Sequence, residues 1–207
     1  MSALYKFRNI DKHAIDTLVN RRLFLANWET LNDPHEAKML VQTPSLNYHM
    51  NPNKLKQKGV TVELSSVRVC SLSASWGSNL LWSHYAAGAR GIAIGVELPD
   101  SLPGIETIEV IYDDIIPKVK PPIGREEITN ALSHKGREWH YEKEIRLLSF
   151  DHDQCYIDNF KIVDLVFGLR TTSEDISLVR SIINDESVRY LQACHKPGSY
   201  GLSGTQI

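Results

Sequence analysis

Three charged residues at alternate positions lead into an apolar run, and this feature constrains the fold more than any other. Glu142, Glu144 and Arg146 precede the mainly apolar segment Leu147-Leu148-Ser149-Phe150. In a β-strand successive side chains point to opposite faces, so these three would project to one side. Charged side chains are rarely fully buried unless they are paired. This face is therefore either a ladder of structural salt bridges or a site where carboxylates hold a polar substrate.

Strands and helices are mixed along the chain without the regular βαβ rhythm of a Rossmann fold. Alternation and β-branched residues predict strands, and apolar residues at helical spacing predict helices. The strongly apolar segment 91–96 is expected at the centre of a sheet. We predict an α+β fold with a mixed, largely antiparallel sheet and flanking helices. The predicted strands are 4–8, 23–26, 67–73, 91–96, 107–112, the run through 150, 162–167 and 188–194, and the predicted helices are 11–22, 35–41, 78–88, 126–136 and 171–183.

The length of 207 residues favours one domain. We predict a single α+β domain over residues 1–196. Residues 42–63 are mostly polar, contain two prolines and carry Lys54, Lys56 and Lys58, so they are interpreted as an exposed polar insertion. Residues 197–207 are rich in glycine and serine and are predicted to form a flexible tail.

Composition argues against several classes of protein. The net charge is −2, so no overall attraction to nucleic acid or to an anionic membrane is expected. No apolar run approaches the roughly 18 residues that a membrane span needs. The first residues lack the apolar core of a signal peptide. The three cysteines form no CxxC pair and indicate reduced thiols, so we predict a cytoplasmic protein that does not bind a membrane.

Familiar catalytic and metal-binding motifs are not found in the sequence. The eight histidines form no HExxH or HxH spacing, and no metal site is predicted. No GxSxG, GxGxxG or Walker A motif is present.

An aromatic cluster at residues 82–85 leaves two interpretations open. One is a half-buried helix whose Trp82, His84 and Tyr85 find hydrogen-bond partners. The other is an aromatic wall for a flat ligand, to which His84 or Tyr85 presents a polar tip.

Five short motifs occur in order, at residues 4–8, 31–36, 70–73, 81–86 and 139–146. Together they resemble the bacterial DUF2971 family, which shares that series. The resemblance covers residues 4 to about 170. The family is defined without a function, so it implies no chemistry by itself.

A more remote resemblance does imply chemistry. Arg8 on the first strand, Ser71-x-Ser73 on a later strand and Glu142-x-Glu144 are similar, in order, to the arginine-type ADP-ribosyltransferases. This resemblance implies a split NAD-binding sheet. It assigns the dinucleotide contact to Arg8, support of the nicotinamide pocket to Ser71 and Ser73, and stabilisation of the ribosyl cation to Glu144 with Glu142. The middle residue of Ser-x-Ser is leucine here, where that superfamily has threonine.

The resemblance implies an NAD-dependent ADP-ribosyltransferase-like enzyme that acts on a protein or nucleic acid, as a toxin or phage-conflict factor does. NAD is then the substrate, and Tyr5, His84 and Tyr85 complete the predicted cofactor-binding residues. Two alternatives stay open. One is a non-enzymatic module that binds a nucleotide or a protein. The other is a nuclease in which Asp33, Glu36 and Glu144 hold a divalent metal ion. The sequence does not indicate the oligomeric state.

Geometry decides between a site and a scaffold. If Glu144 shares a cleft with Arg8 and Ser73, a catalytic role is expected. If Arg146 neutralises Glu144 away from any cleft, the glutamates are structural.

Overall fold

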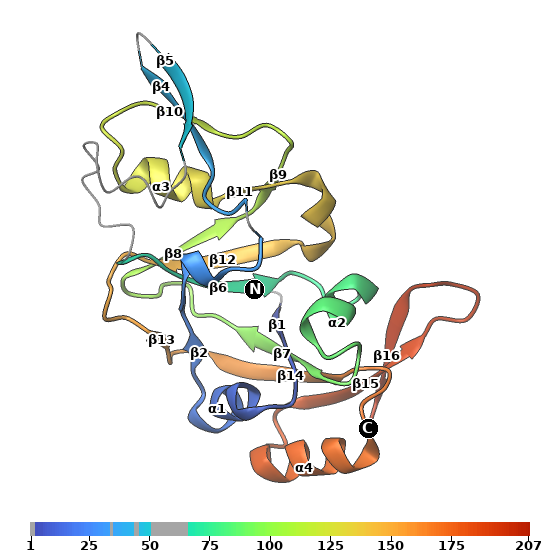
Figure 1. Cartoon of the computed structure of the whole chain (residues 1–207). Helices are drawn as coiled ribbons and strands as arrows, with labels where there is room; N and C mark the ends of the chain where they lie inside the picture. The colour runs from blue at the N-terminus through green and yellow to red at the C-terminus, as the bar shows by residue number, and fades with distance from the viewer. Residues whose placement is uncertain (1–2, 34, 44–45, 51–65) are drawn as a thin grey trace.

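The computed structural model describes residues 3–33, 35–43, 46–50 and 66–207, which form an α+β structure around one large sheet (Figure 1). Neighbouring strands of this sheet are antiparallel except β14 and β15, which are parallel. This confirms the predicted α+β class and the largely antiparallel sheet. The strand order is β16 (Leu202–Gln206), β15 (Arg189–His195), β14 (Lys161–Phe167), β7 (Ile92–Glu97), β1 (Leu4–Arg8), β6 (Arg68–Ser73), β12 (Glu144–Ser149) and β8 (Ile105–Glu109), and β3 (Ala26–Asn27) also pairs with β6.

Smaller sheets and helices surround the large sheet. The three-stranded sheet is formed by β10 (Lys118–Val119), β4 (Met39–Thr43) and β5 (Leu46–Met50), and two pairs by β11 (His134–Lys135) with β9 (Ile111–Tyr112) and by β13 (Tyr156–Ile157) with β2 (Leu23–Phe24). The α-helices are α1 (Lys12–Asn20), α2 (Asn79–Tyr85), α3 (Arg125–Leu132) and α4 (Ser173–Ile183), and two 3₁₀ helices are η1 (Trp28–Thr30) and η4 (Arg137–Glu142).

Local sequence explains where the first helix lies. The carboxylate of Asp11 accepts hydrogen bonds from the backbone amides of His13 and Ala14 and so caps the start of α1. The helix ends before Arg21, whose backbone is left-handed with φ 50°. Ala14 and Leu18 are buried in one core cluster with residues of β7 and β14.

Helices cover both faces of the sheet. The helices α1 and α4 pack together on one face of β7 and β14, where their apolar side chains form one core cluster. The helix α2 packs on the other face of the same strands (Figure 1). A third cluster lies between α3, β4 and the strands β6 and β12. The strand β7 is buried through Val96 and has a neighbour on each side, so the prediction that it is central is confirmed.

The large sheet is nearly divided between β1 and β6. The strand β1 pairs with β7 along its whole length, from Leu4 opposite Val96 to Arg8 opposite Ile92. By contrast it meets β6 at one pair, Tyr5 opposite Ser73. The sheet therefore opens along the rest of the β1–β6 boundary.

Several predictions of local structure differ from the elements that the structure shows. Residues 35–41 were predicted as a helix, but Met39–Thr43 form β4 because they pair with both β5 and β10. The predicted flexible tail, 197–207, contains the edge strand β16, which pairs with β15 over five residues. The start of the predicted insertion at 42–63 belongs to β4 and β5; Lys54, Lys56 and Lys58 lie outside the described residues.

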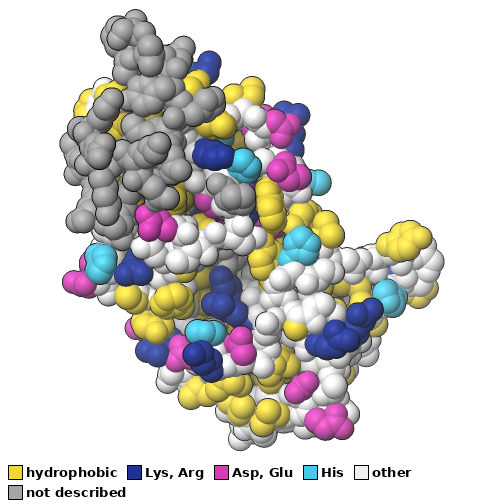
Figure 2. All heavy atoms as spheres, viewed as in Figure 1, with side chains coloured by type: hydrophobic (Ala, Val, Ile, Leu, Met, Phe, Trp, Pro, Cys, Tyr) yellow, Lys and Arg dark blue, Asp and Glu magenta, His cyan; other side chains and the backbone are white. Residues whose placement is uncertain are grey.

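Acidic and basic side chains are interspersed over the face shown in Figure 2, outside the grey atoms. This distribution agrees with the small net charge of −2. In the part of the chain that the structure describes, no helix combines the length and the apolar character needed to cross a membrane.

Candidate functional site

A cavity of about 290 Å³ lies where β1 and β6 separate. The edge of β6 that faces β1 is paired at Val69 with β3 and at Ser73 with β1, and it is open between these positions. The cavity is lined by residues of β1, β6, α2, the segment after η1, and the charged residues that end η4 and begin β12. These are Tyr5, Lys6, Phe7, Arg8, Thr30, Leu31, Asn32, Glu36, Ser71, Leu72, Ser73, Leu81, Tyr85, Lys135, Glu142 and Glu144. We call this cavity the cleft.

One wall of the cleft is a buried network of charges around Arg146. The Nε of Arg146 donates to Oε1 of Glu144 at 2.8 Å, and one terminal nitrogen donates to Oε2 at 2.9 Å. Both terminal nitrogens also donate to the carboxylate of Glu36 at 2.7 Å, and one donates to the carbonyl oxygen of Leu132 at 2.7 Å. The side chain of Arg146 is fully buried. Arg146 therefore pairs with Glu144, as one of the two alternatives had it, but the pair lies beside the cleft and not away from it.

Lys135 connects three carboxylates in the same wall. Its Nζ lies 2.6 Å from Glu142, 3.3 Å from Glu144 and 3.6 Å from Glu36. Glu142 was predicted on the strand, but it ends the 3₁₀ helix η4, and the left-handed Lys143, with φ 44°, separates it from β12. Its carboxylate nevertheless joins the same network as Glu144.

The network keeps Glu144 ionised. Burial alone would raise the pKa of Glu144, but the charge and hydrogen bonds of Arg146, with the charge of Lys135 and a hydrogen bond from Ser71, lower it to about 2. Burial opposes the charge on Lys135, yet the three surrounding carboxylates outweigh burial and raise its pKa. Three carboxylates and two cations leave one negative charge on this wall.

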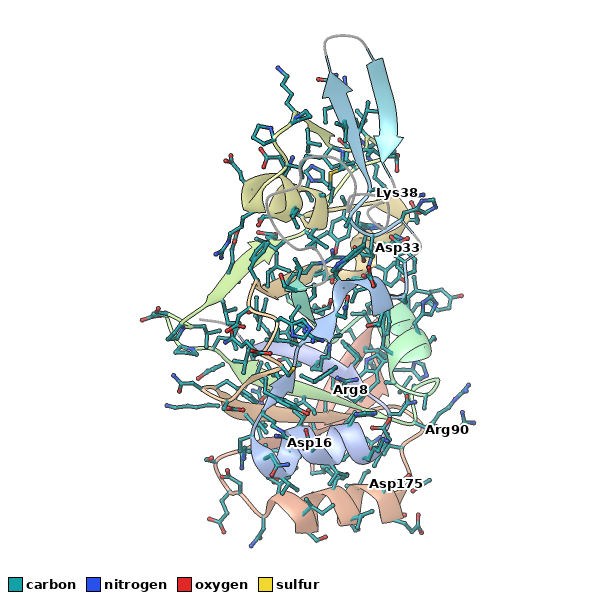
Figure 3. The ribbon with its side chains drawn as sticks, turned by 60° about the vertical axis from the view of Figure 1, so that its left-hand side comes forward. Arg8, Asp16, Asp33, Lys38, Arg90 and Asp175 are labelled. Carbon is teal, nitrogen blue, oxygen red and sulfur yellow. The ribbon has the colours of Figure 1, made fainter. Side chains whose placement is uncertain are left out.

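The opposite wall carries two cations that have no carboxylate partner among the described residues. Lys6 and Arg8 lie on one face of β1 because they are two residues apart. The buried Nε of Arg8 has no hydrogen-bond partner within the described ranges. Figure 3 shows Arg8 between α1, which carries Asp16, and the segment that carries Asp33. An unpaired buried guanidinium donor on a cavity wall is suited to bind an anion.

The two serines of the predicted Ser-x-Ser motif lie between these walls. Ser71 is opposite Arg146 on β12, and Ser73 is opposite Glu144. The hydroxyl oxygen of Ser73 lies 2.6 Å from the carbonyl oxygen of Glu142 and 2.8 Å from that of Ser75, so its single proton is donated to one of the two. Ser73 therefore positions the end of η4, while Ser71 bonds Glu144 directly.

Tyr85 closes one end of the cleft. Its hydroxyl donates to Oε1 of Glu142 at 2.7 Å and accepts from Asn32 at 2.7 Å. Burial and the bond to Glu142 raise the pKa of Tyr85. His84 does not line the cleft; its exposed ring contacts Tyr141, with ring centroids 6.0 Å apart. Both interpretations of this aromatic helix thus apply in part, since Trp82 is buried in the core and Tyr85 faces the cleft.

Tyr5 lies where β1 pairs with β6, but its hydroxyl group bonds a residue that does not line the cleft. The hydroxyl donates to Asp164 at 2.8 Å, and Arg189 binds the same carboxylate through two nitrogens at 2.9 Å. Burial and Asp164 raise the pKa of Tyr5. Tyr5 therefore contributes to the cleft without offering it a free hydroxyl group.

The residues proposed for a metal-dependent nuclease are not brought together. Glu36 and Glu144 both bind Arg146, whereas Asp33 lines a separate cavity with His35 and Lys38. Within the described ranges, no group of three or more histidine, cysteine or carboxylate side chains is placed to hold a metal ion.

Sequence reasoning missed three residues of the cleft. Lys135 falls within a segment predicted as helix, and nothing local marks it as buried among carboxylates. Asn32 reaches Tyr85 across 53 positions of sequence. Lys6 carried a usable signal, because strand alternation already placed it beside Arg8.

Comparison with protein-family models, with curated proteins and with solved structures finds no match for this chain.

Proposed function

We propose that the protein binds NAD and transfers or hydrolyses its ADP-ribose group. The single observation that carries this proposal is that Arg8 and Glu144, 136 positions apart, line one cleft together with Ser71 and Ser73. The cleft opens where the sheet divides, and the remote resemblance to ADP-ribosyltransferases implies a split sheet.

The charges of the two walls suit the reaction. When nicotinamide leaves, positive charge develops on the ribose, and a fixed carboxylate lowers the energy of that state. Glu144 is ionised and held in place by Arg146, and its wall retains one net negative charge. Arg8 on the opposite wall offers donors to the diphosphate.

The acceptor in this proposal is a protein or a nucleic acid, as in a toxin or phage-conflict factor. We place the protein in the cytoplasm in the same proposal. All three cysteines, Cys70, Cys155 and Cys194, are free, which suits a reducing compartment.

NAD binding and turnover test the proposal. We expect NAD to raise the unfolding midpoint of the protein and to be cleaved to nicotinamide, with a bacterial lysate supplying acceptors. Glu144→Gln should lower nicotinamide release on the order of 100-fold, since it removes the charge that stabilises the transition state. Arg8→Lys should weaken NAD binding about tenfold, because it loses the bidentate anion contact.

Two matched variants serve as controls. Glu109→Gln changes an exposed carboxylate on β8, next to β12, and Arg90→Lys changes an exposed guanidinium after α2 (Figure 3). Both should behave like the unaltered protein. If NAD neither stabilises the protein nor is consumed, and Glu144→Gln matches Glu109→Gln, the proposal fails.

A non-enzymatic binding module is the second candidate, and a row of partly exposed aromatic rings near Tyr85 favours it. The ring centroids of Trp139 and Tyr141 are 6.2 Å apart, and those of Tyr141 and His84 are 6.0 Å apart. Aromatic surfaces of this kind bind flat or extended ligands without any chemical step. Stabilisation by NAD without release of nicotinamide would support this candidate against the enzyme.

A further inference from the structure

Lys6 differs from the other lysine of the cleft in its partners. Lys135 lies within 3.6 Å of three carboxylates. Lys6 is half-buried and donates from Nζ to the backbone carbonyl oxygen of Ser71 at 2.8 Å. No carboxylate of the described residues forms an ion pair with it. Lys6 therefore sits on the open edge of β6 as an amine held by one neutral acceptor.

The surroundings of Lys6 favour the neutral amine. Burial lowers the pKa of Lys6, and the positive charge of Arg8 lowers it further, while Cys70 and Glu144 act in the opposite direction. A desolvated lysine next to another cation is the usual arrangement for a nucleophilic amine. The pKa of Lys135, among its carboxylates, is raised instead. The pKa values of the two lysines in the cleft are therefore shifted in opposite directions, downwards for Lys6 and upwards for Lys135.

Arg8 adds a second requirement for a ligand. It lies two residues from Lys6 on the same face of β1, and its buried Nε is unpaired among the described residues. Residues two apart in a strand are about 7 Å apart, which is the span of a small molecule that carries a reactive group at one end and an anion at the other.

We propose that Lys6 forms an imine with an aldehyde that carries an anionic group, and that Arg8 binds the anion. The lone pair of Nζ attacks the carbonyl carbon, and the carbonyl electron pair moves to oxygen. A proton passes from nitrogen to that oxygen, and the resulting carbinolamine loses one water molecule as the C=N bond forms. No oxidant or reductant takes part.

This chemistry does not depend on cleavage of NAD, although the two are compatible. Phosphorylated aldehydes and the open-chain form of ADP-ribose both carry an aldehyde together with an anion. Pyridoxal 5′-phosphate represents the first kind in the experiment, and ADP-ribose represents the second.

Borohydride trapping and peptide mapping test the inference. The protein is incubated with substoichiometric pyridoxal 5′-phosphate at neutral pH, reduced with borohydride, digested and analysed by mass spectrometry. A lowered pKa raises the fraction of the reactive neutral amine, so we expect labelling of Lys6 to exceed that of every exposed lysine. Lys6→Arg should abolish the labelled peptide, and Lys161→Arg, which changes an exposed lysine at the start of β14, should leave it unchanged.

Further experiments identify which kind of aldehyde reacts with Lys6 and test the role of Arg8. Pyridoxal without its phosphate, and the Arg8→Gln variant with the phosphate, should both lose the preference for Lys6. Reduction with cyanoborohydride in the presence of ADP-ribose should label the same peptide if ADP-ribose is the source. Labelling spread over exposed lysines, with Lys6 no faster than Lys161 in the unaltered protein, overturns the inference. That result is independent of NAD turnover and requires no variant to fold.

Discussion

At the residue scale, Arg146 links structure and proposed chemistry. Its guanidinium has five N–H donors, and the structure uses five contacts, to Glu144, Glu36 and the carbonyl oxygen of Leu132. A fully satisfied guanidinium cannot move without breaking several bonds at once. Pairing and catalysis are therefore not alternatives for Glu144, because the pairing fixes its carboxylate on the cleft wall.

The pH dependence of stability should report on Glu144. Its pKa is about 2 in the folded protein, against an ordinary value of 4.5. A lowered carboxyl pKa contributes stability that is complete above about pH 4.5 and is lost as the pH falls towards 2. At about 1.4 kcal/mol per pKa unit, this contribution is about 3 kcal/mol. Denaturant unfolding from pH 6 downwards should show the difference between the unaltered protein and Glu144→Gln shrinking in acid.

Glu109→Gln is the control for this experiment, because Glu109 is exposed on the neighbouring strand. Its difference from the unaltered protein should stay small at every pH. A gap between the unaltered protein and Glu144→Gln that stays constant down to pH 3 would contradict the lowered pKa.

The sequence predicted part of this network for a clear reason. Glu144 and Arg146 are two residues apart on a strand, so their contact is local and alternation places both on one face. Glu36 joins them from 110 positions away, and Lys135 joins them across η4, which separates it from β12. No local pattern marks such residues as buried.

At the element scale, strands with strong local signals were predicted well, and those that depend on partners were not. The strand β1 was predicted with the bounds that the structure shows, since Tyr5 and Phe7 alternate with polar neighbours. By contrast β16 contains Ser203, Gly204 and Thr205, whose composition suggests a loop. It is a strand because β15 offers an edge for it to pair with.

Gly95 allows β7 to sit against the buried Tyr5–Asp164 hydrogen bond. A Cβ at this position would lie 2.6 Å from Cβ of Asp164 and 2.9 Å from Cε1 of Tyr5. Gly95→Ala should therefore lower the free energy of unfolding by about 1–3 kcal/mol, as overpacking of a core does. Urea unfolding measures the change.

Gly204→Ala on β16 is the matched control. There the nearest atom to an added Cβ is the flexible Cδ1 of Leu191 at 3.3 Å, so a smaller loss is expected. Equal stability of the two variants would show that the space around Gly95 is not limiting.

At the scale of the whole molecule, the cleft is a gap in a sheet rather than a hollow on its surface. The strands β16, β15, β14, β7 and β1 form one part of the sheet, and β6, β12 and β8 form the other. One backbone pair, Tyr5 with Ser73, joins them. Side-chain bonds also cross the boundary, from Lys6 to Ser71 and from Tyr85 to Glu142. A ligand in the cleft would touch both parts and add to these few connections.

Backbone hydrogen exchange should reveal this division. In an antiparallel sheet the N–H groups of successive residues point alternately to the two neighbouring strands. Amides of β1 that point to β7 should exchange slowly, while those that point to β6 should exchange fast away from Tyr5. Every amide of the central segment Ile92–Val96, which has a strand on both sides, should be slow. Exchange followed by NMR gives both sets in one experiment. Uniform protection along β1 would mean that β1 and β6 are hydrogen-bonded at more than one residue pair. The cleft would then lack the open strand edge on which both proposed reactions depend.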